Sequence, residues 1–396
     1  MKFRNIPGAA LFLVFSFLFV DLATAEGNIH AGPLKIHPYI SVKEEYNTNI
    51  YATVNDREDD FITSVKPGLR LELPIRRHSL LLDYNVTDIN YEEHHGENST
   101  DQYGIGALDL RLGERLGLRL MDVYNKGHEP RGSSSTGSIE RFKNNTAGAT
   151  VFYALMDVSK VELNYAFTNW IFVTDANAFR ERDEHLVSAY FYYKFLPKTS
   201  VFIEYDNKMA DFELAASPLD NTVNSGYLGL KWEISESSTG IVKGGYSWKN
   251  FDEDVIEDYN TWTASANLTH EFTSSTSVML NAARTVNETN LNFPVLMRYF
   301  VTTGGYAELK QAILKKFYAK INGSFGQDVY SDEQIVTSGE LERRKDNTTS
   351  GGAGIGYDIQ DWLKLAVDYT YKVRNSNLDS VEYITNATVF TVKIEL

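Results

Sequence analysis

The sequence predicts an all-β fold: a closed antiparallel transmembrane β-barrel of about eighteen strands, with sixteen as the alternative count, short periplasmic turns and long extracellular loops. Three observations lead to this prediction. Apolar side chains recur at every second position from about residue 35 to the last residue, and the links between these segments alternate in length. After residue 25, no apolar run approaches the ~20 residues that a membrane-spanning helix needs.

The first 25 residues have the order of a secretory signal peptide. Lys2 and Arg4 precede an apolar run over residues 9–20, and Ala23-Thr24-Ala25 follows. We expect Sec-dependent export and cleavage after Ala25, with residues 26–34 a short periplasmic segment and residues 35–396 the barrel. The alternative is a membrane anchor, but the apolar run is shorter than the ~20 residues required.

The composition argues against one class of partner and excludes one means of stabilising the fold. The formal net charge is -15, which argues against a nucleic-acid partner. The chain has no cysteine, so disulfides do not stabilise the fold. No Pro-rich or Ser-rich linker divides the sequence, and one continuous architecture is the simpler interpretation.

Alternation is clear near the C-terminus, over residues 361–374. One face there is apolar and the other is polar, because successive side chains of a strand point to opposite faces. The apolar positions are Leu363, Leu365, Val367, Tyr369, Tyr371 and Val373, and the opposite face carries Lys364, Ala366, Asp368, Thr370 and Lys372. We count eighteen such segments, centred near residues 40, 67, 83, 106, 120, 149, 163, 190, 204, 229, 243, 265, 280, 304, 320, 352, 367 and 389.

The links alternate between short and long, beginning and ending with a long one. Short links are predicted at residues 74–77, 113–114, 156–157, 196–198, 235–237, 273–275, 313–314 and 360–361. Long polar links include residues 47–58, 125–138, 170–181, 211–219 and 329–342. Bacterial outer-membrane barrels have short periplasmic turns and long extracellular loops, so the order predicts nine outer loops and eight inner turns.

Closure of the sheet follows from the membrane environment. In lipid every backbone N–H and C=O must be paired, and an open sheet edge would leave a row of them bare. The last residues alternate up to Leu396, as in barrels inserted into the outer membrane, although the usual terminal aromatic is Leu here. A two-sheet sandwich or a β-helix is the alternative, but its turns would be Gly/Asn-rich at both ends.

Aromatic residues make up 13% of the chain and would form girdles at the two headgroup levels. Ordinary sandwich packing is the alternative explanation. The girdle candidates are Tyr84, Tyr165, Tyr193, Phe195, Trp232, Trp262 and Tyr369.

Eighteen strands would enclose an aqueous channel, unlike the filled interior of an eight-stranded barrel. Both signs of charge occur at inward-facing positions, together with tyrosines, and such a wall suits a hydroxyl-rich solute such as a sugar chain. The alternative is a solvated wall without selectivity. The predicted lumen-lining residues are Arg70, Asp83, Asp109, Arg111, Arg119, Glu162, Tyr190, Tyr192, Lys194, Glu204, Lys231, Glu233, Lys316, Lys320, Lys364 and Asp368.

The sequence contains no recognisable catalytic motif. It has no G-x-S-x-G elbow, no H-E-x-x-H and no phosphate-binding G-x-x-x-x-G-K-[ST], so we expect no enzyme activity, cofactor or metal. His94 and His95 lie among glutamates, where an exposed acidic loop is favoured over a metal or acid/base site. The outward faces would contact outer-membrane lipid. The acidic stretches 56–60 and 251–258 could bridge cations of lipopolysaccharide, although solvated loop charge is favoured.

One part of the sequence resembles a known family. It runs Pro38-Tyr39-Ile40-Ser41-Val42-Lys43-Glu44-Glu45-Tyr46-Asn47-Thr48-Asn49-Ile50-Tyr51, then Asp59-Asp60-Phe61 and Pro67-Gly68-Leu69, then Arg77-His78 before Leu80-Leu81-Leu82-Asp83-Tyr84, with Tyr91 closing that strand. This pattern resembles the opening of the putative beta-barrel porin family, often encoded with exopolysaccharide and capsule biosynthesis genes. The specific resemblance covers roughly residues 35–110.

The resemblance implies an outer-membrane barrel of Gram-negative cells that helps to move a secreted polysaccharide outward. Its partners would be the polysaccharide and periplasmic components of a synthesis and export machine. The family has no catalytic residues to transfer. Two other hypotheses stay open: a general or solute-specific diffusion porin, and a barrel that acts as an adhesin or enzyme.

Overall fold

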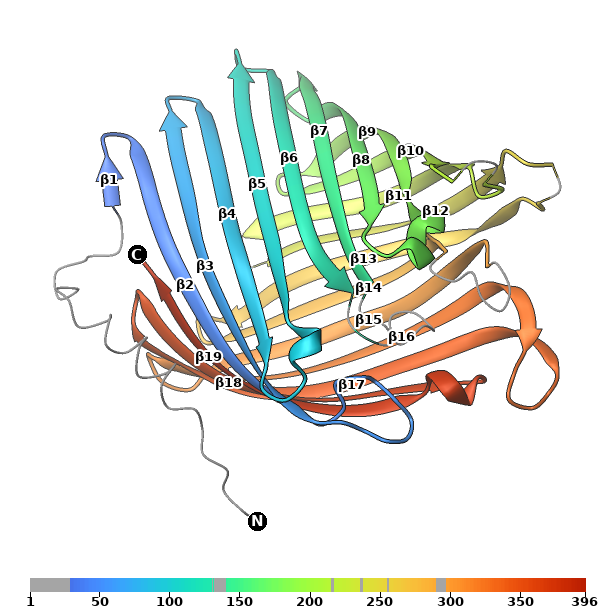
Figure 1. Cartoon of the computed structure of the whole chain (residues 1–396). Coiled ribbons are helices and arrows are strands. Elements are labelled where there is room, and N and C mark those ends of the chain that lie inside the picture. The colour runs from blue at the N-terminus through green and yellow to red at the C-terminus, as the bar shows by residue number, and fades with distance from the viewer. Residues whose placement is uncertain are drawn as a thin grey trace.

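The computed structural model describes residues 29–129, 131, 140–214, 217–235, 238–254, 256–289 and 297–396. Eighteen antiparallel strands, β2 to β19, form a closed barrel, and a short strand β1 pairs with β2 (Figure 1). The strands are β1 (Ile29–Ala31), β2 (Leu34–Asn47), β3 (Asp60–Ile75), β4 (His78–Tyr91), β5 (Ser99–Leu112), β6 (Leu116–Glu129), β7 (Glu140–Met156), β8 (Ser159–Phe172), β9 (Arg182–Leu196), β10 (Thr199–Phe212), β11 (Asn221–Ser235), β12 (Ser238–Phe251), β13 (Tyr259–Thr273), β14 (Thr276–Glu288), β15 (Tyr299–Ala312), β16 (Phe317–Ile335), β17 (Leu341–Gln360), β18 (Leu363–Ser376) and β19 (Tyr383–Glu395).

The first and last barrel strands close the sheet. β19 pairs with β2 in antiparallel register, with Val392 opposite Val42, and the Leu396 amide donates to the Pro38 carbonyl at 3.0 Å. Figure 1 shows β2 and β19 side by side. Closure pairs the backbone groups of both strands, as lipid requires. The predicted closed antiparallel barrel of about eighteen strands is confirmed.

Each of the eight predicted short links lies where one strand is followed by its paired neighbour, from β3 and β4 to β17 and β18. The β3–β4 turn places Arg76 at φ 54, and the β5–β6 turn uses Gly113 at φ 79. Tight hairpins need such left-handed positions, which glycine adopts without strain. The nine longer links lie at the opposite rim, as the alternation predicts, and their described residues include the short 3-10 helices η2 (His95–Glu97), η3 (Asp175–Arg180) and η4 (Asp379–Val381).

The prediction of a long loop over residues 329–342 is wrong. β16 continues to Ile335 and β17 begins at Leu341, so residues 336–340 alone link them. Beyond an irregularity after Val329, Glu333 pairs with Arg343 and Gln334 with Glu342. Polar or charged residues occupy both faces over residues 331–334 and 342–345, so period-two apolar patterning does not reveal the strand.

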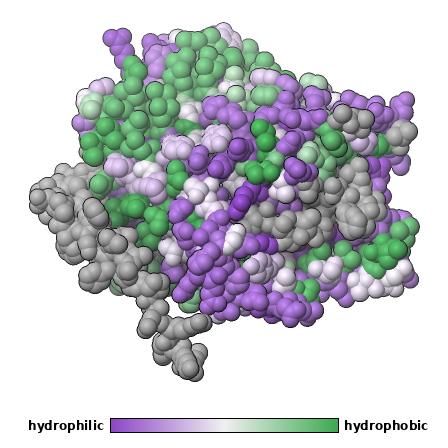
Figure 2. Space-filling view, viewed as in Figure 1, coloured by the Kyte–Doolittle hydropathy of each residue, from purple (hydrophilic) through white to green (hydrophobic). Residues whose placement is uncertain are grey.

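One face of the sheet is apolar and exposed. Among the girdle candidates, Tyr84, Tyr165, Tyr193, Phe195, Trp262 and Tyr369 are large exposed aromatics on this face. Figure 2 shows apolar side chains gathered over the ends of β3 to β6 that carry the short turns, and hydrophilic ones toward the long loops. In the described part of the chain no helix is long and apolar enough to span a membrane.

The predicted signal peptide, residues 1–25, lies outside the described residues. Within the segment predicted to precede the barrel, residues 29–31 form β1, which turns through Gly32 at φ 65 and pairs with the start of β2. The barrel wall therefore starts at Leu34, one residue before the predicted boundary.

Candidate functional site

The pairing register places the predicted lumen residues on the polar face of the sheet, which is the inward face of the closed barrel. Arg70 is directly paired with Asp83, and Asp109 with Arg119. The remaining strand residues of the set alternate with exposed apolar side chains and therefore share this face. Lys316 lies in the β15–β16 turn and donates to the Ile359 carbonyl at 2.6 Å. That they line a solute path stays a prediction.

Many of these residues form ion pairs along the wall. Arg70 Nε lies 2.9 Å from Asp83, Arg119 Nε 2.7 Å from Asp109, Lys231 Nζ 2.9 Å from Glu233 and Lys320 Nζ 2.8 Å from Asp368. The Tyr190 hydroxyl donates to Glu204 at 2.9 Å, and Glu162 accepts from Lys160 at 2.7 Å. Arg111 instead stacks on Phe152 at 4.6 Å. In the described part of the barrel, neither Lys194 nor Lys364 forms an ion pair with another member of the predicted set. The Tyr192 ring instead contacts Lys160. Opposite charges thus alternate along the wall.

Sequence reasoning missed two lysines that complete this arrangement. Lys160 pairs with Glu162, and Lys243 Nζ lies 2.5 Å from Glu204, two strands away. Both alternate with apolar neighbours, Val161 and Val242, so the period-two pattern applied to every residue of the strand would assign them to the inward face. Glu162 lies two residues from Lys160 on β8 itself, whereas the partner of Lys243 lies on another strand, which sequence alone does not pair.

Aromatic rings gather on the inner face of β7 to β11. We call Phe152, Tyr190, Tyr192, Phe202 and Tyr227 the aromatic lane. Tyr190 and Tyr192 stack with centroids 5.7 Å apart and planes at 11°, and Phe202 lies 5.4 Å from Tyr192. Lys160 Nζ is 4.5 Å from the Tyr192 ring, and Lys243 Nζ is 4.1 Å from the Tyr227 ring. The lane thus presents flat rings flanked by cations.

Two lane rings lie flat against the wall because the residue directly opposite is glycine. Phe152 on β7 pairs with Gly117 on β6, and Phe202 on β10 pairs with Gly229 on β11. A Cβ at either glycine would overlap the ring. Aromatic cover of a cross-strand glycine fills the wall and leaves the space in front of the ring open.

A cavity lies at the short-turn end of the lane. It has a volume of about 470 Å³, and its lining includes Tyr192, four lysines and the two carboxylates Asp157 and Glu233. The four lysines are Lys160, Lys194, Lys198 and Lys231. The periplasmic side of the lane is therefore rich in positive charge.

Near the long loops, the ends of β14 and β15 leave the wall. Pairing between β13 and β14 stops at Ala264 opposite Arg284, whereas β14 and β15 stay paired up to Glu288 opposite Tyr299. Tyr299 and Val301 share the face of the exposed Leu309, yet they are buried against Phe251 on the inner face of β12. The outer ends of β14 and β15 therefore lie across the inner face of the neighbouring wall.

Buried charges hold this inward-folded segment. We call Glu288 and its partners Lys208, Asn221 and Lys249 the Glu288 cluster. The Glu288 carboxylate accepts from Lys249 at 2.8 Å, and from Lys208 and Asn221 at 3.2 Å each. Lys208 lies on β10, four strands from Glu288 on β14, and only an inward-folded segment brings them together. Lys249 and Glu288 are both buried, and losing one partner of such a pair strongly destabilises the folded protein.

The same architecture decides the family. A family model, described as "Putative beta-barrel porin 2", matches residues 25–396. The chain belongs to this family. The resemblance found in residues 35–110 is confirmed, and the protein is an outer-membrane β-barrel of the porin kind, whose family members are channels rather than enzymes.

Several solved structures are similar to this porin. The outer membrane protein opdK from Pseudomonas aeruginosa is 9% identical, with a TM-score of 0.48, over 91% of this chain and 99% of that chain. OccAB4 from Acinetobacter baumannii is 12% identical, with a TM-score of 0.49, over 91% and 98%. OccK2 (OpdF) from Pseudomonas aeruginosa is 8% identical, with a TM-score of 0.49, over 92% and 97%. No curated protein matches the chain.

His94 and His95 make contacts that hold the loop around them in place. His94 Nδ1 lies 2.9 Å from Asp60, and His95 Nδ1 lies 3.0 Å from the Tyr91 carbonyl. Burial, with the charge of Glu97, raises the pKa of the Tyr51 phenol, whose ring packs edge-on against His94. Within the described ranges no group of three or more His, Asp or Glu side chains is arranged to hold a metal. The contacts join the first two outer loops.

Proposed function

We propose that this porin conducts a hydroxyl-rich polymer, and that it serves in export of an exopolysaccharide or capsular polysaccharide. The observation that carries the proposal is the aromatic lane. Its rings lie along the inner wall between ion pairs such as Lys160–Glu162 and Lys243–Glu204.

The chemistry of the lane suits carbohydrate. A pyranose has faces of C–H groups that pack on aromatic rings, while its hydroxyls bond to charged or polar groups at the ring edges. Tyr190 and Tyr192 offer two stacked rings, and Glu204 and Lys160 lie beside them. A series of weak contacts of this kind lets a polymer slide, because no single contact holds it.

The direction of transport and the partners rest on the resemblance of residues 35–110 to porins encoded with polysaccharide genes. In this proposal the chain crosses the inner membrane by the Sec route, loses residues 1–25 and works with periplasmic components of the synthesis machine. The lysine-lined cavity at the short-turn rim would be the entrance for an acidic polymer.

A second candidate is a diffusion porin for small polar solutes. The observation that favours it is the inward-folded end of β14 and β15, held by the Glu288 cluster at the outer rim. A segment in that place narrows the exit, and a small solute passes a narrow exit more readily than a polymer.

The first experiment is single-channel recording of the refolded porin in planar bilayers. We would compare dextran, the acidic polymer hyaluronate and polyethylene glycol of similar size. The carbohydrates are expected to block the current for longer than polyethylene glycol does, because only they stack on the lane. Tyr190→Ala/Tyr192→Ala should shorten the carbohydrate blocks, whereas Tyr193→Ala, on the outward face, should leave them unchanged.

A cellular assay tests export itself. Cells without the gene should retain polymer in the periplasm, and the wild-type gene should restore surface polymer better than Tyr190→Ala/Tyr192→Ala does. Equal blocking by polyethylene glycol and carbohydrate would remove the lane from the mechanism. Normal surface polymer in the deletion strain, with a conducting porin, would favour the diffusion porin.

A further inference from the structure

The outward face of β6 and β7 carries a group of cations near the long loops. Lys126 on β6 is directly paired with Lys143 on β7. Arg141 lies two positions before Lys143 on β7, nearer the long loop. They share the face of Leu120 and Val151, which are exposed apolar residues lower on the same strands. We call Lys126, Arg141 and Lys143 the basic patch. It faces away from the lumen.

The described residues supply no carboxylate partner to the basic patch. Asp88 accepts from Asn90 at 2.7 Å, and Asp101 lies 3.0 Å from His128. Residues 132–139, next in the chain, contain neither Asp nor Glu. Like charges directly opposite each other on one face of a sheet are destabilising, so this pair calls for an external anion. It stands out in a chain whose net charge is -15.

The basic patch lies at the height of lipid headgroups. Lys126 follows Leu116, the first residue of β6, by ten residues. At ~3.3 Å per residue and a tilt of ~40°, that separation is roughly 25 Å along the membrane normal, which is about the height of the apolar band of an outer-membrane barrel. The patch therefore lies just beyond the hydrocarbon, on the side of the long loops.

A cavity of about 500 Å³ surrounds the patch. Besides the three cations, its lining includes the polar residues Asn98, Ser99 and Thr100 and the carboxylates Asp88 and Asp101. An anionic head that also carries hydroxyl or amide groups would find both charge and hydrogen-bonding partners there.

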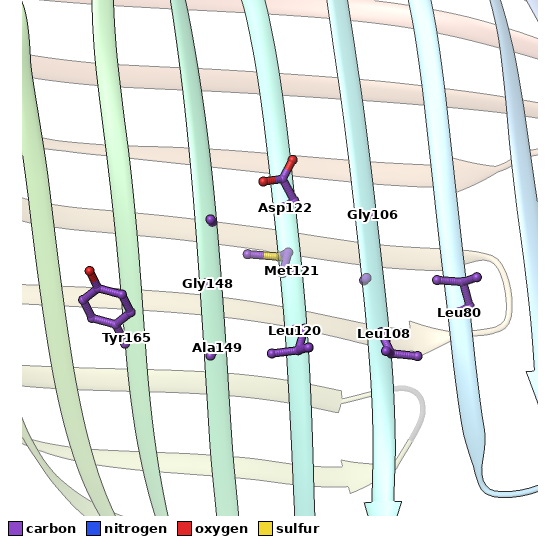
Figure 3. A pocket seen from close by; sticks show the side chains of 11 residues that line it. Leu80, Gly106, Leu108, Leu120, Met121, Asp122, Gly148, Ala149 and Tyr165 are labelled. Carbon is purple, nitrogen blue, oxygen red and sulfur yellow. The ribbon is translucent and has the colours of Figure 1, made fainter.

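An apolar groove of about 460 Å³ lies on the same wall, nearer the short turns. Its lining includes small residues, among them Gly106 and Ala149, with Leu80 and Tyr165 at the two sides and Leu120 between them. Figure 3 shows the labelled residues spread over adjacent strands of the same wall. Asp122 lies between groove and patch and accepts from Asn145 at 3.3 Å. Because these side chains are small, an acyl chain has room to lie along the wall.

We propose that this surface binds one phosphorylated glycolipid of the outer leaflet, with phosphate on the basic patch and an acyl chain in the groove. Charge and position select this ligand. Three cations attract phosphate, and the groove beneath them lies on the lipid-exposed face, where a soluble acidic protein does not reach. The site is separate from the lumen and does not depend on the proposed function.

The test is a lipid titration of the full-length purified porin in detergent, read by native mass spectrometry. The probes are diphosphoryl lipid A and the same lipid with its phosphates removed. The wild type should bind the diphosphoryl form at least tenfold more tightly, because each cation near an anionic surface contributes measurably to binding. Lys126→Gln/Lys143→Gln should remove this preference. The matched control Arg343→Gln/Lys345→Gln, on the outer extension of β17, should retain it.

A second variant tests the groove. Ala147→Leu adds bulk to its lining and should weaken both lipids equally, while the preference for phosphate persists. Heat-modifiable mobility would show that each variant is folded. Equal binding of the two lipids by the wild type would overturn the proposal, even if no variant folds. Loss of preference in the β17 control as well would show non-specific attraction and would also overturn it. Competition by millimolar inorganic phosphate would point to a free anion instead of a lipid.

Discussion

Phe152 on β7 lies flat over Gly117 on β6, its direct cross-strand partner, and the Arg111 guanidinium stacks on the ring at 4.6 Å from its centroid. The glycine sets the position of the ring, and the ring sets the position of the guanidinium. Three strands thus cooperate to place one cation at the inner wall. Removing the space above Gly117 should therefore change the lumen without touching a charge.

Gly117→Val should push Phe152 and Arg111 into the lumen. We expect lower single-channel conductance and a loss of about 1–3 kcal/mol in the free energy of unfolding, because overpacking forces side chains from their preferred rotamers. Gly226→Val is the control, since no atom lies within 4 Å of a Cβ there. Unchanged conductance in folded Gly117→Val would show that the ring does not narrow the path.

Glu288→Gln should loosen the inward-folded ends of β14 and β15. It leaves the buried Lys249 without its carboxylate partner and Lys208 with Glu184 alone, and losing one partner of a buried pair costs about 3–5 kcal/mol. Glu233→Gln is the matched control, because its pair with Lys231 is solvent-exposed and contributes about 0–1 kcal/mol. Urea unfolding in lipid vesicles measures both. A larger conductance should accompany the loss in Glu288→Gln, and an unaltered pore would place the segment away from the path.

Arg284→Met should open the split between β13 and β14. The guanidinium donates to the Thr261 hydroxyl at 2.8 Å and to the Trp262 carbonyl, where strand pairing has ended. Leaving these acceptors without a donor should cost about 1–3 kcal/mol. Hydrogen exchange should rise at residues 260–263 and stay constant in β18. Thr261→Val, which removes the hydroxyl alone, should have the smaller effect.

The two faces of the wall can be compared at adjacent positions. Leu163 is 54% exposed on the outward face of β8, and Asn164 follows it on the inward face. Leu163→Arg should destabilise the barrel by about 2–4 kcal/mol, because it exposes a charge to the lipid interior. Asn164→Arg, beside Glu162, should be tolerated. Equal destabilisation in vesicle unfolding would mean that the face assignment is wrong.

The sequence by itself determined the wall. Period-two alternation is a local property of each strand, and short turns have local requirements, so eighteen strands and eight turns could be located from neighbouring residues alone. The faces followed too, which is why Arg70, Tyr190 and Asp368 were assigned to the polar side. Closure followed from the need to pair backbone groups in lipid.

Only the tertiary structure decided what depends on partners distant in the chain. The meeting of Lys208 with Glu288, and of Lys243 with Glu204, depends on curvature and on where β14 leaves the wall. The extension of β16 and β17 stayed hidden because no lipid enforces alternation there. Local pattern records the medium that each face meets, whereas long-range ion pairs depend on the geometry that closure produces.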